Sequence, residues 1–347
     1  MHTAIGFLLV CTVTVGALDN RTKGNENLTI KKCSDEFFED LHTLDDDGHP
    51  VLSKDYPETM KETEKNLHER VLFHLSTRAK NTSEQLYLDD VGTLEKSQFD
   101  PNKETKFITH GWFSSCNVDA CLLIRDAFLQ HGDYNVILID WSAISNKSYQ
   151  WSASRVLMVA QYVSKMIDFL VTRGMKPSNV TIVGHSLGGH VAGLSARYAK
   201  SNVNYVIALD PARPNFLFVS PGNRVSRGDA KYVEVIHTNA GLLGYTYSIG
   251  DVDFYPNGGF QQNGCGIAGV DIEGSCSHSR AYEYYAESIN SDLGFVGRKC
   301  GSYKDFQVDK CELNGTAIMG GVTPKFNVTG NYYLNTLSKA PFAKGRS

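Results

Sequence analysis

The sequence predicts an α/β fold in which helices cover both faces of a mostly parallel sheet. Short runs of aliphatic and β-branched residues alternate with longer amphipathic segments through the middle of the chain, and this alternation is typical of parallel sheets. The run at residues 135–139 is nearly continuous in apolar residues, as expected of a strand covered on both faces. The segment 153–172 spaces its apolar residues at the period of a helix, and Gly174 and Pro177 follow it as stop signals.

The remaining elements can be placed in chain order. Strands are expected at residues 71–76, 106–109, 135–139, 180–183 and 205–209. Helices are expected at residues 153–172 and 190–200, with a short helix around residues 58–67. Beyond Asp210 the sequence is richer in glycine, asparagine and tyrosine, which predicts longer loops.

Residues 1–17 are predicted to be a secretory signal peptide. A mildly polar start is followed by an apolar run at residues 4–15, and cleavage is expected after Ala17. The run is much shorter than the roughly 20 residues that a membrane-spanning helix requires. The protein is therefore expected to be secreted and extracellular. Residues 18–66 read as a polar N-terminal extension, and residues 67–347 as one domain with a single large core.

Glycosylation motifs and overall charge agree with an extracellular protein that binds no nucleic acid. Asn-x-Ser/Thr motifs begin at Asn20, Asn27, Asn81, Asn146, Asn179, Asn314 and Asn327. The formal net charge is −4 and the pI is about 6.3, which argues against an electrostatic nucleic-acid binder. No run of lysine and arginine is present to bind anionic membranes.

The cysteines predict a set of local disulfides. Cys11 lies in the signal peptide, and six of the others form close pairs: Cys116 with Cys121, Cys265 with Cys276, and Cys300 with Cys311. In an oxidising compartment such pairs favour disulfides, and the alternative, a zinc site, lacks Cys-x-x-Cys spacing and nearby histidines in the order of a zinc finger. Cys33 is left over, as a free thiol, as an intermolecular bridge, or as a sign that the pairing differs.

The segment 184–188, Gly-His-Ser-Leu-Gly, matches the nucleophile elbow of α/β-hydrolases. The motif alone is weak evidence, because a G-x-S-x-G match arises easily by chance in a glycine-rich chain. Here it stands between a predicted β-branched strand and a predicted amphipathic helix, which is the setting it requires. We therefore expect Ser186 to be a nucleophile, and the alternative is a glycine-rich turn that happens to contain a serine.

A serine nucleophile needs an imidazole base and an acid that orients the imidazole. In this fold both follow the serine along the chain. Asp210 directly follows the next predicted strand, whereas Asp140 precedes the serine and is the weaker candidate. For the base, His278 lies in an expected loop beside Cys276, before a helix that starts near Arg280. His237 ends the alternating run at 232–236 and suits packing better, so His278 is favoured.

Two backbone N–H groups are expected to bind the oxyanion of the tetrahedral intermediate. One is that of Leu187, directly after the nucleophile, and the other should come from an early strand-to-helix loop. His110-Gly111-Trp112 ends the second predicted strand, so the Trp112 N–H is the candidate. An ordinary β-turn is the alternative interpretation of this tripeptide.

From about Val71 to Ala340 the chain resembles the animal pancreatic lipase family, most of all its phospholipase A1 members from insects. The segments that carry the resemblance are Phe107-Ile108-Thr109-His110-Gly111-Trp112, residues 184–189, Ala208-Leu209-Asp210-Pro211-Ala212, Val252-Asp253-Phe254-Tyr255-Pro256-Asn257-Gly258-Gly259 and Cys276-Ser277-His278-Ser279-Arg280. The resemblance implies an α/β-hydrolase fold. It also implies a catalytic triad of Ser186, Asp210 and His278, with Trp112 and Leu187 as oxyanion donors.

The chain departs from the family's lipases in three places. They carry a C-terminal β-sandwich domain, for which no room is left before Ser347, so no colipase partner is expected. Asp229 and Arg224 match the family's calcium loop, but Pro221 and Ser226 stand where carboxylates would be needed. Since Ca²⁺ requires oxygen ligands, no metal and no cofactor are expected.

The third departure concerns two short loops. The lid between Cys265 and Cys276 encloses only ten residues, and the loop between His237 and Gly250 is also short. Within the family, short versions of both loops accompany phospholipase A1 activity. The expected function is therefore sn-1 ester hydrolysis of phospholipids at a membrane or micelle surface. The alternatives are a neutral triacylglycerol lipase, a galactolipase, or a non-catalytic lipid-binding, yolk-like protein.

Overall fold

The computed structural model describes residues 43–44, 50–51, 58–266, 274–311 and 315–345. The predicted signal peptide, Cys33 and most of the predicted N-terminal extension lie outside the described residues. So do residues 267–273 of the short lid loop.

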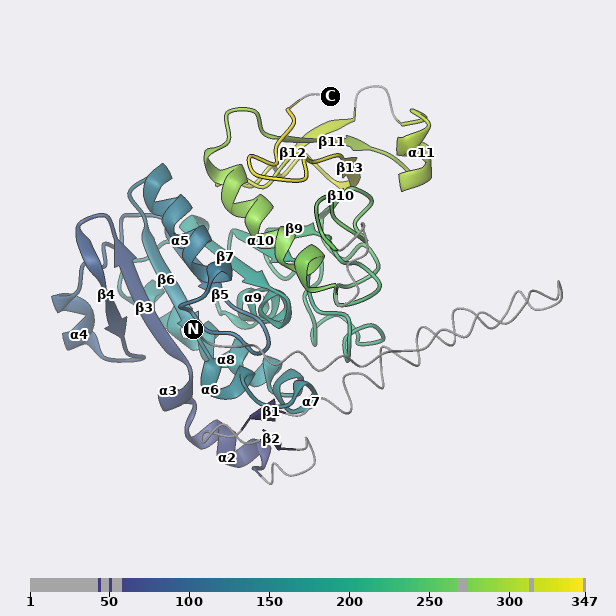
Figure 1. The fold of residues 1–347 in the computed structure, drawn as a ribbon. Coiled ribbons are helices and arrows are strands. Elements are labelled where there is room, and N and C mark those ends of the chain that lie inside the picture. Colours follow the sequence, from purple (N-terminus) through teal and green to yellow (C-terminus); the bar gives the residue numbers. More distant parts are fainter. Residues whose placement is uncertain (1–42, 45–49, 52–57, 267–273, 312–314, 346–347) are drawn as a thin grey trace, which may run out of the picture.

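An eleven-stranded sheet runs through the molecule (Figure 1), and the described residues also form one separate pair of short strands. In spatial order the strands of the large sheet are β12 (Thr316–Met319), β11 (Phe295–Lys299), β13 (Gly330–Leu334), β10 (Val252–Pro256), β9 (Tyr232–Ile236), β8 (Tyr205–Leu209), β7 (Val180–His185), β5 (Thr105–Thr109), β6 (Asn135–Asp140), β3 (Leu72–Thr77) and β4 (Lys80–Leu86). The seven neighbouring strands β13, β10, β9, β8, β7, β5 and β6 pair in parallel. Antiparallel strands flank them at both ends of the sheet. The separate pair is β1 (Thr43–Leu44) with β2 (Pro50–Val51). The predicted α/β class and its five predicted strands are confirmed.

Helices pack on both faces of this sheet. The helices are α2 (Met60–Lys65), α3 (Leu67–Arg70), α4 (Val91–Lys96), α5 (Asp119–His131), α6 (Ser142–Ser145), α7 (Tyr149–Ala153), α8 (Val156–Thr172), α9 (Leu187–Tyr198), α10 (Ser275–Asn290) and α11 (Tyr303–Gln307), with a 3₁₀ turn at Pro177–Asn179. The predicted helices at 58–67, 153–172 and 190–200 correspond to α2 with α3, to α7 with α8, and to α9.

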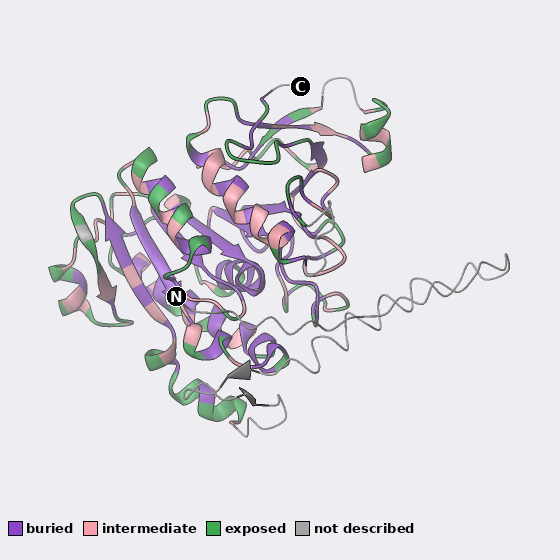
Figure 2. Ribbon diagram, in the orientation of Figure 1, coloured by how far each residue is buried: buried purple, intermediate pink, exposed green. Residues whose placement is uncertain are grey.

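Alternate residues of the central strands feed two separate hydrophobic cores. In β5, Phe107 packs with the residues of α8 and α9, whereas Ile108 packs with those of α5 and α10. In β6, Ile137 and Ile139 face the first core, and Leu138 faces the second. Because both faces of these strands are covered, apolar residues follow one another along them, at 107–108 in β5 and at 136–139 in β6. Figure 2 shows the central strands buried and the outer elements exposed.

The register of the parallel strands brings the chain segments of interest to one edge of the sheet. Thr109 of β5 lies opposite Gly184 of β7. His185, the last residue of β7, lies opposite Leu209, the last residue of β8. The residues that follow these strand ends, including Ser186 and Asp210, therefore emerge side by side, as the strand order of an open α/β sheet requires.

The start of helix α10 differs from the prediction. The sequence places His278 in a loop before a helix near Arg280, but α10 begins at Ser275, so that prediction is wrong. Gly274 precedes the helix with φ 68°, and the His278 N–H donates to its carbonyl at 2.9 Å. Serine and cysteine at the start of the helix concealed it, because such residues have low intrinsic helix propensity.

Two of the three predicted disulfides are present. Cys265 is bonded to Cys276 and Cys300 to Cys311. The predicted bond between Cys116 and Cys121 is not formed, and both residues are buried free thiols. The Cys116 thiol instead donates to Asp140 Oδ2 at 3.1 Å. This hydrogen bond turns the Cys116 side chain toward the end of β6. The close spacing of the two cysteines in the sequence could not indicate that direction.

In the part of the chain that the structure describes, no helix combines the length and the apolar character needed to cross a bilayer.

The central strands are expected to dominate stability. Ile182 of β7 is fully buried in the first core, so Ile182→Ala should lower the free energy of unfolding by about 2–5 kcal/mol. The matched control is Ile318→Ala in the edge strand β12, where the side chain is 48% exposed. There the expected loss in the free energy of unfolding is about 0.5 kcal/mol or less. Urea unfolding curves measure both, and equal losses would contradict this account.

Candidate active site

Ser186 occupies the sharp turn between strand β7 and helix α9. Its backbone has φ 59° and ψ −124°, a left-handed conformation that costs energy for any residue with a side chain. The Ser186 carbonyl accepts from the N–H groups of Gly189 at 3.0 Å and Ala212 at 3.2 Å. The turn is thus held from the helix and from the segment after β8, and the serine lies at the sheet edge.

Glycines make this turn possible by allowing backbones to touch. A Cβ at Gly184 would lie 2.0 Å from the Gly188 carbonyl oxygen, and a Cβ at Gly188 would lie 2.4 Å from the His110 carbonyl oxygen. A Cβ at Gly111 would lie 2.7 Å from the Cβ of Ser186. No side chain fits at these three positions. The loop after β5 therefore packs directly against the serine.

Asp210 and His278 are joined by a hydrogen bond. Asp210 follows β8 and is fully buried, and its Oδ2 lies 2.5 Å from His278 Nδ1. Its Oδ1 accepts from the backbone N–H groups of Thr238 at 2.9 Å and Asn239 at 3.0 Å. A Cβ at Gly244 would lie 2.2 Å from Oδ1, so this carboxylate is closely surrounded and fixed in direction.

His278 itself is held from two sides. Cys276, two residues earlier, is bonded to Cys265. His185 Nε2 lies 3.0 Å from the His278 carbonyl oxygen, and the centroids of the two rings are 4.4 Å apart. Burial holds the pKa of His185 well below its usual range, so at neutral pH its ring is uncharged and Nε2 donates its one proton to that carbonyl. Sequence reasoning did not identify His185, because the second position of G-x-S-x-G carries no fixed residue type.

Ser186 and His278 line the same cavity, whose volume is about 790 Å³. The size is within the range of small-molecule sites. No hydrogen bond joins the Ser186 hydroxyl to His278 among the described residues. The wall is largely aromatic and aliphatic, and it includes Trp112, Phe113, Val118, Tyr149, Leu243 and Tyr282.

The two predicted oxyanion donors lie next to Ser186. Leu187 is the first residue of α9, where helix N–H groups have no acceptor within the helix. Trp112 lies in the loop after β5, and its indole Nε1–H donates to the Lys147 carbonyl at 2.7 Å. The Phe113 N–H donates to the Ser145 carbonyl at 3.0 Å. The loop that contains Trp112 is therefore fixed to the segment after β6.

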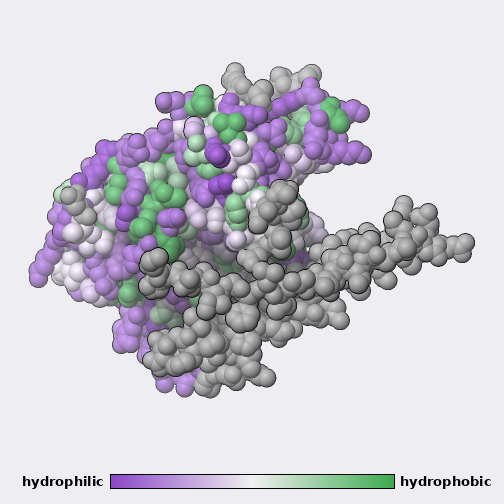
Figure 3. Space-filling model, viewed as in Figure 1, coloured by the Kyte–Doolittle hydropathy of each residue, from purple (hydrophilic) through white to green (hydrophobic). Residues whose placement is uncertain are grey.

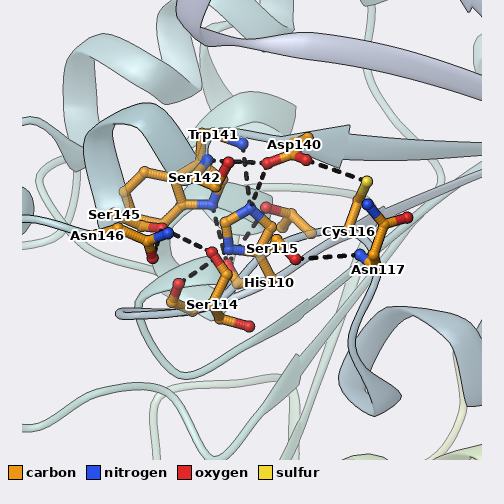
Figure 4. A network of polar contacts seen from close by, with 12 residues as sticks. His110, Ser114, Ser115, Cys116, Asn117, Asp140, Trp141, Ser142, Ser145 and Asn146 are labelled. Atoms are coloured by element: carbon orange, nitrogen blue, oxygen red, sulfur yellow. Dashed lines mark hydrogen bonds and ion pairs between the residues drawn. The ribbon is translucent and has the colours of Figure 1, made fainter. Parts of the chain in front are cut away.

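The alternative acid and base candidates are engaged elsewhere. His237 Nε2 lies 2.9 Å from Asp253 Oδ1, and both side chains are buried. Asp140 Oδ1 lies 3.3 Å from His110 Nε2 in a separate polar network, which Figure 4 shows. The structure thus pairs Asp210 with His278, and neither Asp140 nor His237 contributes to that pair.

The segment that matches the family's calcium loop is internally hydrogen bonded. Asp229 Oδ1 accepts from Arg197 at 3.2 Å, and Oδ2 accepts from the Ser226 N–H at 2.7 Å. Burial raises the pKa of Asp229 to about 6. The guanidinium of Arg224 donates to the Val225 carbonyl and to the Ser226 hydroxyl, each at 2.8 Å.

Apolar side chains gather over helix α5 on the face seen in Figure 3. Val118, which precedes this helix, is 40% exposed and Leu123 is 41% exposed. Phe113, on the wall of the cavity, is 55% exposed. The cavity that contains Ser186 therefore has apolar residues on its exposed rim.

Comparison with known proteins gives one family. The sequence profile of the Lipase family matches residues 45–342. Pancreatic triacylglycerol lipase of Myocastor coypus is 33% identical over 302 residues, which cover 79% of this chain and 66% of that protein. The human pancreatic triacylglycerol lipase is 31% identical over 310 residues, which cover 81% of this chain and 66% of that protein.

A relative that is named inactive has the same identity to this chain as the Myocastor lipase. The dog protein named inactive pancreatic lipase-related protein 1 is 33% identical over 294 residues, which cover 77% of this chain and 63% of that protein. The chain spans about two thirds of the length of these three relatives.

A buried histidine beside the site predicts a pH effect on stability. His190 Nε2 lies 2.7 Å from the Ala212 carbonyl oxygen, and burial lowers the pKa of this histidine to about 3. Below pH about 6.5 the His190 imidazole binds a proton in the unfolded chain but stays neutral in the folded chain. The contribution of this group is therefore complete above pH 6.5 and is lost as the pH falls toward 3.

Between pH 6 and 4, the stability of the native protein should fall faster than that of His190→Gln, by about 1.4 kcal/mol per pH unit. Urea unfolding at a series of pH values measures the two slopes, and carboxyl groups common to both proteins cancel in the difference. His131→Gln, at an exposed position, should leave the slope unchanged. Parallel slopes for the native protein and His190→Gln would disprove the prediction.

Proposed function

Because this chain belongs to the pancreatic lipase family, we propose that it is a secreted serine ester hydrolase of lipids, with phospholipids cleaved at the sn-1 position as its preferred substrates. The observation that carries the proposal is the hydrogen bond from His278 Nδ1 to buried Asp210, because His278 and Ser186 line the same cavity. Three residues far apart in the sequence converge there, in the order that an α/β-hydrolase triad requires.

In the proposed reaction, Ser186 attacks the ester carbonyl. His278 Nε2 takes the serine proton, because Nδ1 donates to Asp210 and leaves Nε2 as the acceptor. The imidazolium then gives this proton to the leaving glycerol oxygen, and an acyl-enzyme remains. Water attacks the acyl carbonyl with His278 again as the base, which releases the fatty acid and restores the serine.

The negative charge of each tetrahedral intermediate is proposed to lie against the N–H groups of Leu187 and Trp112. A preorganised donor of this kind typically contributes a factor of about 10²–10³ in turnover. The contact of Gly111 with Ser186 supports the assignment, since it brings the Trp112 loop against the nucleophile. The hydrogen bonds that fix this loop to the segment after β6 favour a donor that is in place before the substrate arrives.

Two observations bear on the substrate. The ten-residue lid of the sequence is short, and a short lid leaves room for a polar head group beside the acyl groove. The apolar rim at Phe113 and Val118 suits contact with an aggregated lipid. Triacylglycerol hydrolysis is the second candidate, because two of the relatives compared here are named pancreatic triacylglycerol lipases.

Ser186→Ala tests the chemistry and also the non-catalytic alternative. Hydrolysis of a soluble ester should fall by roughly 10⁴- to 10⁶-fold, because the nucleophile is lost while the cavity remains. A fluorophosphonate probe should label the native protein at Ser186 and leave the variant unlabelled. Ser178→Ala, at an exposed position, is the control and should keep full activity. Unchanged hydrolysis in Ser186→Ala would remove this serine from the mechanism.

A panel of lipids tests the substrate preference. Phosphatidylcholine with different labelled acyl chains at sn-1 and sn-2, a galactolipid and triolein are presented in matched mixed micelles. We expect the sn-1 fatty acid of phosphatidylcholine to be released fastest, because an open site accepts the charged head group. Turnover of triolein alone would overturn the phospholipase assignment while leaving the proposed triad intact.

A further inference from the structure

A second cluster of reactive side chains lies at the end of strand β6, and it is formed by His74, Cys116 and Asp140. Strand β3 runs antiparallel to β6, with His74 opposite Leu138 and Leu72 opposite Asp140. Since Leu138 and Asp140 are two residues apart, their side chains share one face of the sheet. His74 and Asp140 are therefore diagonal neighbours on that face, within reach of each other.

Cys116 joins this pair from the loop between β5 and α5. Its sulfur lies 3.1 Å from Asp140 Oδ2. One nitrogen of His74, the sulfur of Cys116 and one carboxylate oxygen of Asp140 all lie within 4.8 Å of one another. No other group of three or more histidine, cysteine or acidic side chains in the described part of the chain meets this criterion.

The surroundings hold Asp140 in a fixed direction. Its Oδ1 accepts from the Ser142 N–H at 2.9 Å and faces His110 Nε2 at 3.3 Å. The same His110 nitrogen accepts from the Trp141 N–H at 3.1 Å. Figure 4 shows these contacts on one side of the carboxylate and the Cys116 sulfur on the other. The carboxylate thus presents Oδ2 toward the thiol.

We propose that His74, Cys116 and Asp140 form a binding site for a divalent cation of the zinc class. Nitrogen, sulfur and carboxylate oxygen together are the donor set that Zn²⁺ uses. A thiolate selects this softer type of ion over Ca²⁺ and Mg²⁺, which take oxygen ligands. Three protein ligands leave the fourth tetrahedral position for a water molecule.

The distances require only a small adjustment. Bonds of about 2.0–2.3 Å in a tetrahedral zinc site separate the ligand atoms by about 3.3–3.8 Å. The sulfur and the carboxylate oxygen are slightly closer than this, and all three ligand atoms lie within 4.8 Å of one another, at most about 1 Å beyond the tetrahedral range. His74 is only half-buried, so its side chain is the ligand with most freedom to adjust.

Binding replaces one hydrogen bond by metal bonds and involves no redox change. In the metal-free protein the Cys116 thiol donates its proton to Asp140. When the cation binds, this proton passes to bulk water, and the thiolate, the Asp140 carboxylate and a neutral imidazole nitrogen of His74 each donate an electron pair to the metal. Every atom of the cluster remains in the same oxidation state.

The site would connect three separate segments of the chain. His74 lies in β3, Asp140 ends β6, and Cys116 lies four residues after Trp112 in the loop against Ser186. A cation at this position therefore clamps that loop to two strands of the sheet. Because the unfolded chain does not bring these ligands together, the bound ion stabilises the folded state.

The test uses the full secreted chain, freed of metal with a chelator and then dialysed against Zn²⁺. We expect one zinc ion per chain by elemental analysis and a thermal unfolding midpoint that rises with zinc concentration. With Co²⁺ in place of zinc, an intense thiolate-to-cobalt charge-transfer absorption is expected. His74→Gln and Cys116→Ala should each weaken zinc binding by at least about tenfold, and Cys116→Ala should abolish the charge-transfer absorption.

Cys121→Ala is the matched control, because Cys121 is also a buried free thiol but is not a member of the cluster. It should bind zinc and cobalt like the native chain, and circular dichroism verifies that each variant is folded. Equal zinc binding by native protein and folded His74→Gln would overturn the proposal. So would absence of stoichiometric binding, or peptide mapping of the secreted chain that finds Cys116 in a disulfide.

Discussion

The hydrogen bond between Asp210 and His278 is the interaction on which the rest of the site depends. It joins residues 68 positions apart, one after strand β8 and the other in helix α10. Asp210 is fully buried and can point only where its surroundings allow. Two backbone N–H groups occupy its other oxygen, and the carboxylate packs so closely on Gly244 that a Cβ there would lie 2.2 Å from Oδ1. The direction of the imidazole is therefore determined by the backbone around Asp210, and the cavity is arranged around that direction.

Much of this arrangement follows from the sequence because parallel strands end at one edge of a sheet. Ser186 and Asp210 each follow a predicted strand, so both were expected at the same edge of the sheet. The position of His278 is less accessible to such reasoning. Helix α10 starts with residues of low helix propensity. The glycine before it does not by itself predict a helix start. The partner of Cys116 was inaccessible for a different reason, since proximity in the sequence does not determine where a thiol points. His74 and Asp140 are neighbours because of the register between β3 and β6. That register cannot be predicted from the residues of the two strands alone.

Buried histidines divide into two roles in this fold. Burial holds the pKa values of His185 and His190 well below the usual range, and each ring contacts a backbone carbonyl beside the site, that of His278 or of Ala212. Such neutral rings act as fixed hydrogen-bonding groups over the whole physiological pH range. His278 differs because it lines the cavity and its Nδ1 is hydrogen bonded to a carboxylate. Among the described residues, only this histidine both lines the cavity and is hydrogen bonded to a carboxylate.

The loop between β5 and α5 has to satisfy two sets of contacts at once. At its start, Gly111 packs on Ser186, so the adjacent Trp112 is confined by the position of the nucleophile. Further along, Ser114 and Cys116 are fixed to the segment that begins with Asp140, through the Ser145 hydroxyl and the Asp140 carboxylate. Few residues separate these anchor points, so the loop can move at one end only if it strains the other. A ligand that moves Cys116 relative to Asp140 therefore acts on the same backbone that presents the Trp112 N–H. The geometry of the proposed oxyanion site and that of the thiol cluster are therefore coupled through the short stretch of chain that joins Trp112 to Cys116.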